Sequence, residues 1–520
     1  MRLNHEDFGE YRIYRPNILI EQEVRTFIEG ELFKEYDSKV YTQYDEINEI
    51  MKKLLRLYSE ILEDNIKKVA SRDFMEFILT QYDITCRINR SKNLSDKEQG
   101  KWNELGPILR RGLKFIAEKI TMIDPREKPE IEDEAVIDST ISKVFIAAEE
   151  MARMYMQSDA TYRVFKDETQ LTLRKGNDTY WELKVNNEFI KQFPKYIQYD
   201  EILEDKQIDL NIKFINAELK EGFKEKFGKD LLEVLSIIRD VSNGCIDEIP
   251  FVKKEILIDV IKENYELDDN ITNEILAGFS ITKEKLIENN RQIFNPKQEY
   301  RALTRGFFEM SHETGKHLVW SKEMVNENLT LLLRGICYKK IPTEWTSKKI
   351  TKNIETITNK VGTWFEKVVE KQLEEKLGIK GYSSIKNRIG VGRNAVSIPE
   401  IVGEIDFIGI NLAKDELILG ECKMISPAVE PRLFHDDISK FMDEGKGYVK
   451  QFNNKIAWFK ENKDLIIECM LKSLNIELTE ERKRNISIRN VLLTFYPSIV
   501  EAYIKDFEIY TLYEFIKKEI

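Results

Sequence analysis

The chain has 520 residues, of which 42% are hydrophobic and 33% charged, and its formal net charge is -11. This length exceeds what one hydrophobic core usually organises, and the composition is that of a folded, helix-rich protein rather than a disordered or collagen-like one. The acidic excess lies almost entirely in residues 1–350. A generally basic protein that coats polyanions is therefore excluded, and any nucleic acid would have to bind a local basic patch.

No run approaches the roughly 18 apolar residues that a membrane helix needs, and the first residues lack the apolar core of a secretion signal. The five cysteines are widely spaced and form no CxxC pair, which argues against a disulfide framework and a structural zinc site. We expect a cytoplasmic protein with reduced thiols and no membrane association.

Residues 1–157 are predicted to form a helical domain. Apolar residues recur at three- and four-residue steps over 42–90, and further helices are expected over about 106–122 and 136–157. Pro125 and Pro129 break the chain between these last two segments. The pattern therefore predicts an all-helical first domain.

Residues 158–350 are predicted to be a mixed, mostly helical region. Apolar and polar residues alternate over 162–185 around a Gly-Asn turn, which indicates a β-hairpin. Helical periodicity returns afterwards, for example over 231–241, 254–265 and 322–333.

Residues 351–520 have the pattern of an α/β domain with a mixed central sheet. A helix over about 360–377 precedes two strands, over 401–410 and 416–425, and a helix over 435–461 is followed by a β-branched run over 486–495. The chain as a whole is thus expected to be an α+β multidomain protein, with a mostly helical N-terminal region and a small β-hairpin element.

The two strands of this third domain carry a group of charged residues. If they pair as an antiparallel hairpin that turns near residues 413–414, Asp406 lies opposite Glu421. Strand alternation places Lys423 on the same face as Glu421 and turns Cys422 to the other face. Two acids and a lysine are therefore expected to converge at one point.

The preceding helix adds a third carboxylate. Glu366 lies on the same face as Leu373 and Leu377, whereas Glu370 is expected on the solvent face. A charge on a buried stripe costs several kcal/mol unless a cation or hydrogen bonds compensate it. Oxygen ligands from such carboxylates suit Mg²⁺, with Mn²⁺ as a substitute, and a lysine beside them could orient water or neutralise charge on a phosphodiester.

These residues resemble a known family. The segments Gly362-x-x-Phe-Glu366, Gly403-Glu-Ile-Asp406 and Glu421-Cys-Lys423 resemble the motifs of the PD-(D/E)XK nuclease superfamily. The resemblance covers roughly residues 355–510 and implies a restriction-endonuclease-like fold with metal ligands at Asp406, Glu421 and Glu366, and a catalytic lysine at Lys423. It also implies a site role for Gln451, while Ile405 stands where the motif has proline.

A basic patch flanks the loop before the strand pair. Four residues of this patch could hold phosphates beside the metal: Lys380, Lys386, Arg388 and Arg393. A solvated loop without such a role is an equal alternative.

The expected function is hydrolysis of DNA phosphodiester bonds by an Mg²⁺-dependent endonuclease, with RNA as an open alternative. The resemblance and the architecture point to a bacterial restriction or antiphage defence system, in which residues 1–350 serve recognition, assembly or autoinhibition. We expect a homo-oligomer, with a separate ATPase or sensor subunit as a further partner. The alternative is a catalytically silent nuclease-fold module that binds nucleic acid or works as a scaffold.

Overall fold

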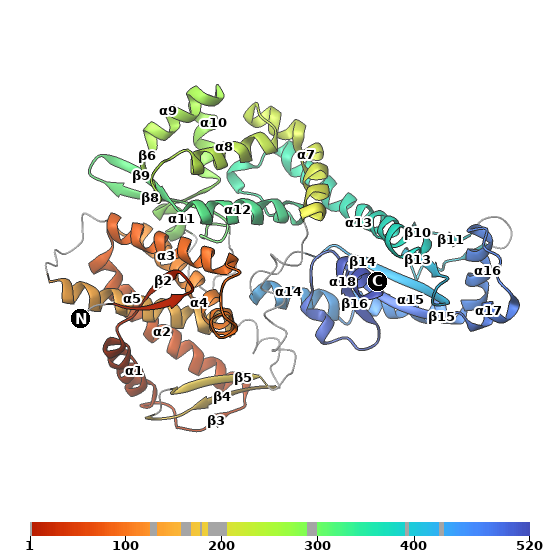
Figure 1. The fold of residues 1–520 in the computed structure, drawn as a ribbon, viewed down its shortest axis with the longest axis horizontal. Helices are drawn as coiled ribbons and strands as arrows, with labels where there is room; N and C mark the ends of the chain where they lie inside the picture. Colours follow the sequence, from red (N-terminus) through yellow and green to blue (C-terminus); the bar gives the residue numbers. More distant parts are fainter. Residues whose placement is uncertain are drawn as a thin grey trace. The chain divides into compact units, whose positions relative to one another are not determined.

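The structure of the chain is a computed structural model (Figure 1). It describes residues 3–124, 133–157, 168–176, 179–185, 205–288, 299–390, 395–425 and 431–520. The predicted break at Pro125 and Pro129, and the first part of the predicted 162–185 hairpin, lie outside these residues. Over the described residues, no helix is both long and apolar enough to cross a membrane.

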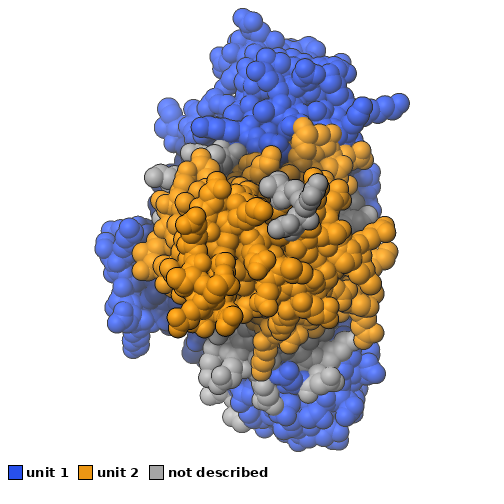
Figure 2. Space-filling view, turned by 90° about the vertical axis from the view of Figure 1, so that its right-hand side faces the viewer, with its two compact units in different colours: residues 1–187, 212–336, 340–353 blue, residues 188–211, 337–339, 354–520 orange. Residues whose placement is uncertain are grey.

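The chain divides into two compact units, which Figure 2 distinguishes by colour. The first unit contains residues 1–187, 212–336 and 340–353, and the second contains residues 188–211, 337–339 and 354–520. Helix α13 (Lys348–Leu377) runs across the boundary at residues 353–354. The further division of residues 1–350 into two domains stays a prediction.

The first unit begins with a hairpin that the sequence analysis missed. Strands β1 (Asn4–Phe8) and β2 (Tyr11–Arg15) pair antiparallel, and Gly9 adopts a positive φ of 57° at their turn. Five-residue strands with mixed exposure give a weak periodic signal beside long helices. The prediction that residues 1–157 are all helical is therefore wrong at this point.

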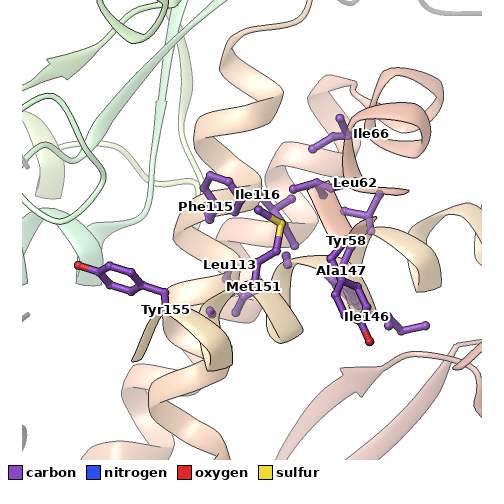
Figure 3. Packing of buried hydrophobic residues seen from close by; sticks show 14 of the residues in the cluster. Tyr58, Leu62, Ile66, Leu113, Phe115, Ile116, Ile146, Ala147, Met151 and Tyr155 are labelled. Atoms are coloured by element: carbon purple, nitrogen blue, oxygen red, sulfur yellow. The ribbon is translucent and has the colours of Figure 1, made fainter. Parts of the chain in front are cut away.

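Five helices follow and form the core of the first unit. Figure 3 shows apolar side chains from α2, α4 and α5 meeting between these helices, among them Leu62, Ile116 and Met151. The predicted helical segment over 42–90 consists of two helices. The second one begins after Ser71, whose side chain caps its N-terminus. The helices are α1 (Ile18–Leu32), α2 (Tyr44–Val69), α3 (Arg72–Arg90), α4 (Asp96–Thr121) and α5 (Glu134–Gln157).

The predicted hairpin after these helices is present. Strands β4 (Thr169–Leu173) and β5 (Trp181–Val185) pair antiparallel, and β3 (Val40–Tyr41) adds a third strand beside β4. The alternating burial of β4 accounts for the period-two pattern of its sequence.

The rest of the first unit contains a four-stranded sheet of order β6-β9-β8-β7. Its strands are β6 (Phe251–Lys253), β7 (Ser280–Ile281), β8 (Phe307–His312) and β9 (Gly315–Trp320). The helices are α7 (Asp205–Phe227), which belongs to the first unit from residue 212 onward, α8 (Leu231–Asn243), α9 (Lys254–Tyr265), α10 (Asp269–Ala277), α11 (Lys283–Glu288) and α12 (Lys322–Gly335).

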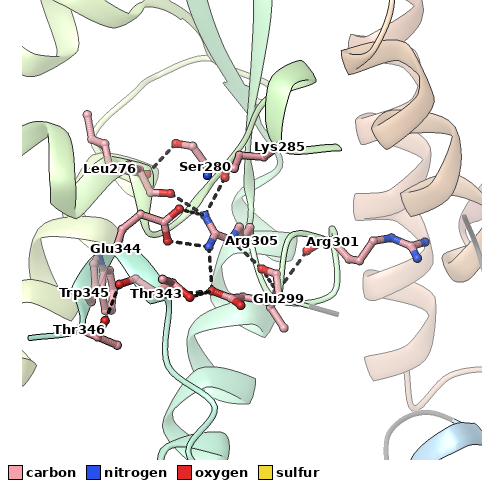
Figure 4. A network of polar contacts seen from close by, with 12 residues as sticks. Leu276, Ser280, Lys285, Glu299, Arg301, Arg305, Thr343, Glu344, Trp345 and Thr346 are labelled. Carbon is pink, nitrogen blue, oxygen red and sulfur yellow. Dashed lines mark hydrogen bonds and ion pairs between the residues drawn. The ribbon is translucent and has the colours of Figure 1, made fainter. Parts of the chain in front are cut away.

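A buried arginine, Arg305, connects several segments of this region through hydrogen bonds and an ion pair (Figure 4). Arg305 is 1% exposed and donates to the carbonyl oxygens of Ala277 and Ser280 and to both carboxylate oxygens of Glu344. The planar guanidinium suits this multidentate arrangement, which satisfies a charge that burial would otherwise penalise.

The second unit is built on a five-stranded sheet of order β10-β13-β14-β15-β16. The first two pairings are antiparallel and the last two are parallel, so the sheet is mixed, and the α+β class is confirmed. The strands are β10 (Lys380–Ile385), β13 (Ile405–Asn411), β14 (Glu416–Lys423), β15 (Ser487–Thr494) and β16 (Glu508–Thr511), with a separate short pair β11 (Arg388–Ile389) and β12 (Val396–Ser397).

Several helices connect these strands. The predicted helix over 435–461 is divided at residues 443–447, where the Asp443 carboxylate accepts from the backbone N–H groups of Gly445 and Lys446. This turn gives the backbone an alternative to the helix. The helices after β14 are α14 (Pro431–Met442), α15 (Tyr448–Glu461), α16 (Lys463–Ser473), α17 (Glu480–Asn485) and, at the end of the chain, α18 (Leu512–Glu519).

Candidate active site

The candidate site lies on three neighbouring strands of the second unit. The observed register pairs Phe407 with Gly420, so its continuation by one residue brings Asp406 opposite Glu421, as predicted. On the other side of β13, the register places Ser384 opposite Asp406. The sheet therefore carries a serine and two carboxylates in one row.

Both carboxylates are buried. Asp406 is 6% exposed and Glu421 is 0% exposed. Oδ2 of Asp406 accepts a hydrogen bond of 2.9 Å from the backbone N–H of Cys422. Carboxylates with so little water around them need cations close by, because the ionised form loses its hydration on burial.

Lys423 supplies one of these cations. Its Nζ lies 2.7 Å from Oε1 of Glu421 and 3.4 Å from Oδ2 of Asp406. Burial opposes the charged ammonium, but the two carboxylates outweigh it and raise the pKa of Lys423 above the ordinary lysine value. In this arrangement Lys423 is a positive charge and a hydrogen-bond donor rather than a proton acceptor.

Two neighbouring residues, Tyr448 and Cys422, lie beside this group of charges. The ring of Tyr448, at the start of α15, lies under the Lys423 ammonium at 5.1 Å. Cys422 is 6% exposed and burial raises the pKa of its thiol well above the usual range, which suits the core position predicted for it.

Lys455 supplies the second cation and was missed by the sequence analysis. Its Nζ lies 2.6 Å from Oε2 of Glu421 and 3.4 Å from Oδ1 of Asp406. The sequence does contain a signal, because Lys455 falls on the apolar stripe of α15 between the buried residues Phe452 and Phe459. A lysine on a buried stripe requires an acidic partner.

Glu366 approaches the group from α13. It is 8% exposed, and its Oε2 accepts a short hydrogen bond from the hydroxyl of Ser384. Burial raises the pKa of Glu366, an effect that the Ser384 hydrogen bond opposes and the negative charge of Asp406 reinforces. The structure thus brings Glu366 within electrostatic range of Asp406 and Lys423.

Ser384 has an unusual backbone conformation. Its φ is 56°, in the left-handed region that residues with a side chain rarely adopt. Such strain is maintained only where the surroundings determine it, and it is concentrated at functional positions. Next to it, Ser383 donates its backbone N–H to Glu370 at 3.0 Å. Glu370 is half-buried, so the prediction that it lies on the solvent face is wrong.

Gln451 is not part of this group of side chains. It is exposed on α15, and its Nε2 donates to the backbone carbonyl of Lys446 at 2.9 Å. Lys455, one helical turn further on, faces the carboxylates instead.

The predicted basic patch is partly described. Lys380, Lys386 and Arg388 are exposed, and Arg393 lies outside the described residues. Lys380 pairs in register with Ile410, at the end of β10 remote from Ser384. Lys386 and Arg388 follow the other end of β10, next to Ser384 and Ile385.

The residues fit a bound cation between the two strand carboxylates. The Lys455 ammonium, itself a cation, contacts one oxygen of Glu421 and one of Asp406. Within the described ranges, no three His, Cys, Asp or Glu side chains are grouped so as to hold a metal ion. The oxygen donors available at this point are therefore the pair Asp406 and Glu421, with Glu366 nearby.

Comparison with known proteins adds no relative to this description. No protein-family model matches the sequence, no curated protein matches it, and no solved structure matches the chain. The interpretation of the site consequently depends on its own geometry.

Proposed function

We propose that this chain is a metal-dependent nuclease that hydrolyses phosphodiester bonds of DNA. The observation that carries the proposal is the convergence of Asp406, Glu421 and Lys423 on one face of a mixed sheet, with both carboxylates buried. Buried acids with a lysine in contact are typical of active sites. The resemblance to PD-(D/E)XK nucleases, with their restriction-endonuclease-like fold, leads to the same function.

Each side chain has a role in this proposal. Asp406 and Glu421 would hold Mg²⁺, with Glu366 as a further carboxylate. When bound, the ion would supply Lewis acidity toward a phosphodiester and an activated water. Lys423, kept positively charged by its neighbours, stabilises negative charge that develops on the phosphate. Ser384 orients Glu366 through its hydroxyl.

The proposed biological setting is a bacterial restriction or antiphage defence system. Residues 1–350 would then recognise the target, assemble a homo-oligomer, engage a separate ATPase or sensor, or restrain the nuclease. The exposed cations Lys386 and Arg388 would bind nucleic-acid phosphates next to the strand end that carries Ser384.

The test is cleavage of supercoiled plasmid, linear duplex, single-stranded DNA and RNA by the full chain with Mg²⁺, Mn²⁺ or EDTA. Lys423→Ala and Asp406→Ala should each abolish metal-dependent cleavage. Lys472→Ala and Asp464→Ala, which remove exposed charges on α16 in the same unit, should leave it unchanged. Cleavage that survives in Asp406→Ala would reject the assignment of the site.

A second candidate is a catalytically silent module that binds nucleic acid. The observation that favours it is Lys455, because an ammonium between the carboxylates can neutralise them without a metal. In this case the full chain binds nucleic acid equally well in EDTA and in Mg²⁺, and cleaves none of the four substrates.

A further inference from the structure

Lys455 and Lys423 both contact the two strand carboxylates, and they do so through different oxygens of each acid. Lys455 contacts Oε2 of Glu421 and Oδ1 of Asp406, whereas Lys423 contacts Oε1 of Glu421 and Oδ2 of Asp406. Each ammonium therefore spans both acids, and two positive charges balance two negative ones.

The two lysines differ in what surrounds them. The Lys423 side chain is 20% exposed, next to Tyr448, while the Lys455 side chain is 8% exposed between Phe452 and Phe459. Lys423 lies on the same strand as Glu421, but Lys455 comes from α15. Lys455 is thus the deeper of the two cations and the one supplied by a separate element.

A divalent ion and the Lys455 ammonium would compete for the same oxygens. Carboxylate oxygens bind Mg²⁺ at about 2.1 Å and carry most of the charge that attracts it. An ammonium within 2.6 Å of Oε2 of Glu421 repels an incoming cation and already satisfies the oxygen. Removal of this one charge should consequently favour metal binding.

We propose that Lys455 is a built-in counter-ion that stabilises the metal-free site and lowers its affinity for divalent cations. This inference rests on the proposed function, because it assigns a regulatory role at the same site. The site then binds metal only when the ion concentration, or bound nucleic acid, compensates the loss of the Lys455 contacts. Lys455 is a competitor of the metal and not a catalytic residue.

The test compares Lys455→Met with the wild-type full chain, using Mn²⁺ alone as the probe. Methionine keeps the unbranched chain and removes the charge. Lys460→Met removes an exposed charge from the same helix and is the matched control. Mn²⁺ affinity is measured by isothermal titration calorimetry and by the electron paramagnetic resonance signal of free Mn²⁺, and thermal unfolding is followed in EDTA and in Mn²⁺.

Lys455→Met is expected to bind Mn²⁺ at least about tenfold more tightly. The repulsion between two unit charges in contact near a protein surface is large enough to change a binding constant by more than this factor. Its melting temperature should fall in EDTA and recover in Mn²⁺, while Lys460→Met behaves as wild type. If Lys455→Met does not fold without metal, Lys455→Gln provides a neutral side chain that still donates to the carboxylates, and its Mn²⁺ affinity should also rise.

Unchanged or weaker Mn²⁺ binding by folded Lys455→Met and Lys455→Gln would overturn the counter-ion role, and so would a lack of Mn²⁺ binding in all variants. These readouts do not depend on cleavage. Tighter Mn²⁺ binding in a chain that cuts no nucleic acid rejects the proposed hydrolysis but supports the counter-ion. Cleavage by the wild type with no change in Mn²⁺ affinity rejects the counter-ion alone.

Discussion

The Lys423 ammonium lies 2.7 Å from Oε1 of Glu421, a carboxylate with no exposed surface. The other oxygen of Glu421 is held by Lys455 at 2.6 Å, so this glutamate is the central negative charge between two cations. Breaking such a buried arrangement on one side leaves like charges facing each other without water. Glu421 should therefore matter for stability as well as for chemistry.

Glu421→Gln is expected to destabilise the metal-free protein by about 3 kcal/mol, the scale found when one partner of a buried ion pair is removed. The substitution keeps the shape of the side chain and leaves Lys423 and Lys455 with Asp406 alone. Differential scanning calorimetry in EDTA measures the effect as a lower transition temperature of the second unit. Glu480→Gln is the control, because Glu480 is an exposed residue paired with Lys483, and it should change the transition little.

An unchanged transition in Glu421→Gln would mean that water or side-chain movement relieves the remaining charges. Glu421 would then not be the central charge of the site.

A second prediction concerns Ser384, whose φ of 56° is costly for any residue with a Cβ. Ser384→Gly and Ser384→Ala both lose the hydroxyl that bonds Glu366, but only glycine removes the backbone strain. Ser384→Gly should accordingly be more stable than Ser384→Ala by about 1 kcal/mol. Calorimetry of the two variants measures this difference directly.

Ser383 provides the matched comparison. It lies on the same strand and also bonds a glutamate on α13, Glu370, but its φ is not among the positive values of the described residues. The order should be reversed there, with Ser383→Ala more stable than Ser383→Gly, because glycine loses more conformational freedom on folding. The same order at both positions would argue against strain at Ser384.

The strand pair of the site could be predicted from the sequence because its information is local. Two apolar strands joined by a short turn fix their own register, which is why Asp406 and Glu421 were correctly placed opposite each other. The side on which Cys422 lies follows from the same alternation. Nothing beyond the spacing of these residues is needed.

The contribution of α15 could not be predicted in the same way. The position of a helix against a sheet depends on packing between segments distant in sequence, so the rotation that turns Lys455 inward and Gln451 outward is not encoded in spacing alone. The family resemblance directed attention to Gln451. The apolar stripe of Phe452 and Phe459 would have pointed to Lys455 instead.

The first unit contains a buried acid, Asp83, that the sequence analysis did not single out. It lies on α3, is 6% exposed, and accepts a short hydrogen bond from the hydroxyl of Ser321, the N-cap residue of α12. Burial raises the pKa of Asp83 to about 7, an effect that the Ser321 hydrogen bond opposes and the charge of Glu323 reinforces.

This pKa predicts a specific dependence of stability on pH. In the unfolded chain Asp83 loses its proton near pH 3.8, as an ordinary aspartate does, whereas in the folded chain it retains the proton until about pH 7. Between these values the folded state binds more protons than the unfolded state, so the contribution of Asp83 to stability is complete below about pH 4 and is lost as the pH rises from there through 7. Asp83→Asn, which stays neutral and can still accept from Ser321, should remove this loss.

The variant should therefore be more stable than wild type at pH 8 by at most about 4 kcal/mol, which corresponds to about a thousandfold difference in proton affinity, and equal to it at pH 4. Thermal unfolding of both proteins from pH 4 to pH 8 measures the difference. Asp64→Asn, which alters an exposed acid on α2, controls for the change in net charge. Parallel stability curves for Asp83→Asn and wild type across this range would show that Asp83 has the same pKa in the folded and the unfolded chain, with the effect of burial offset by a cation such as Arg87, whose charge lowers this pKa.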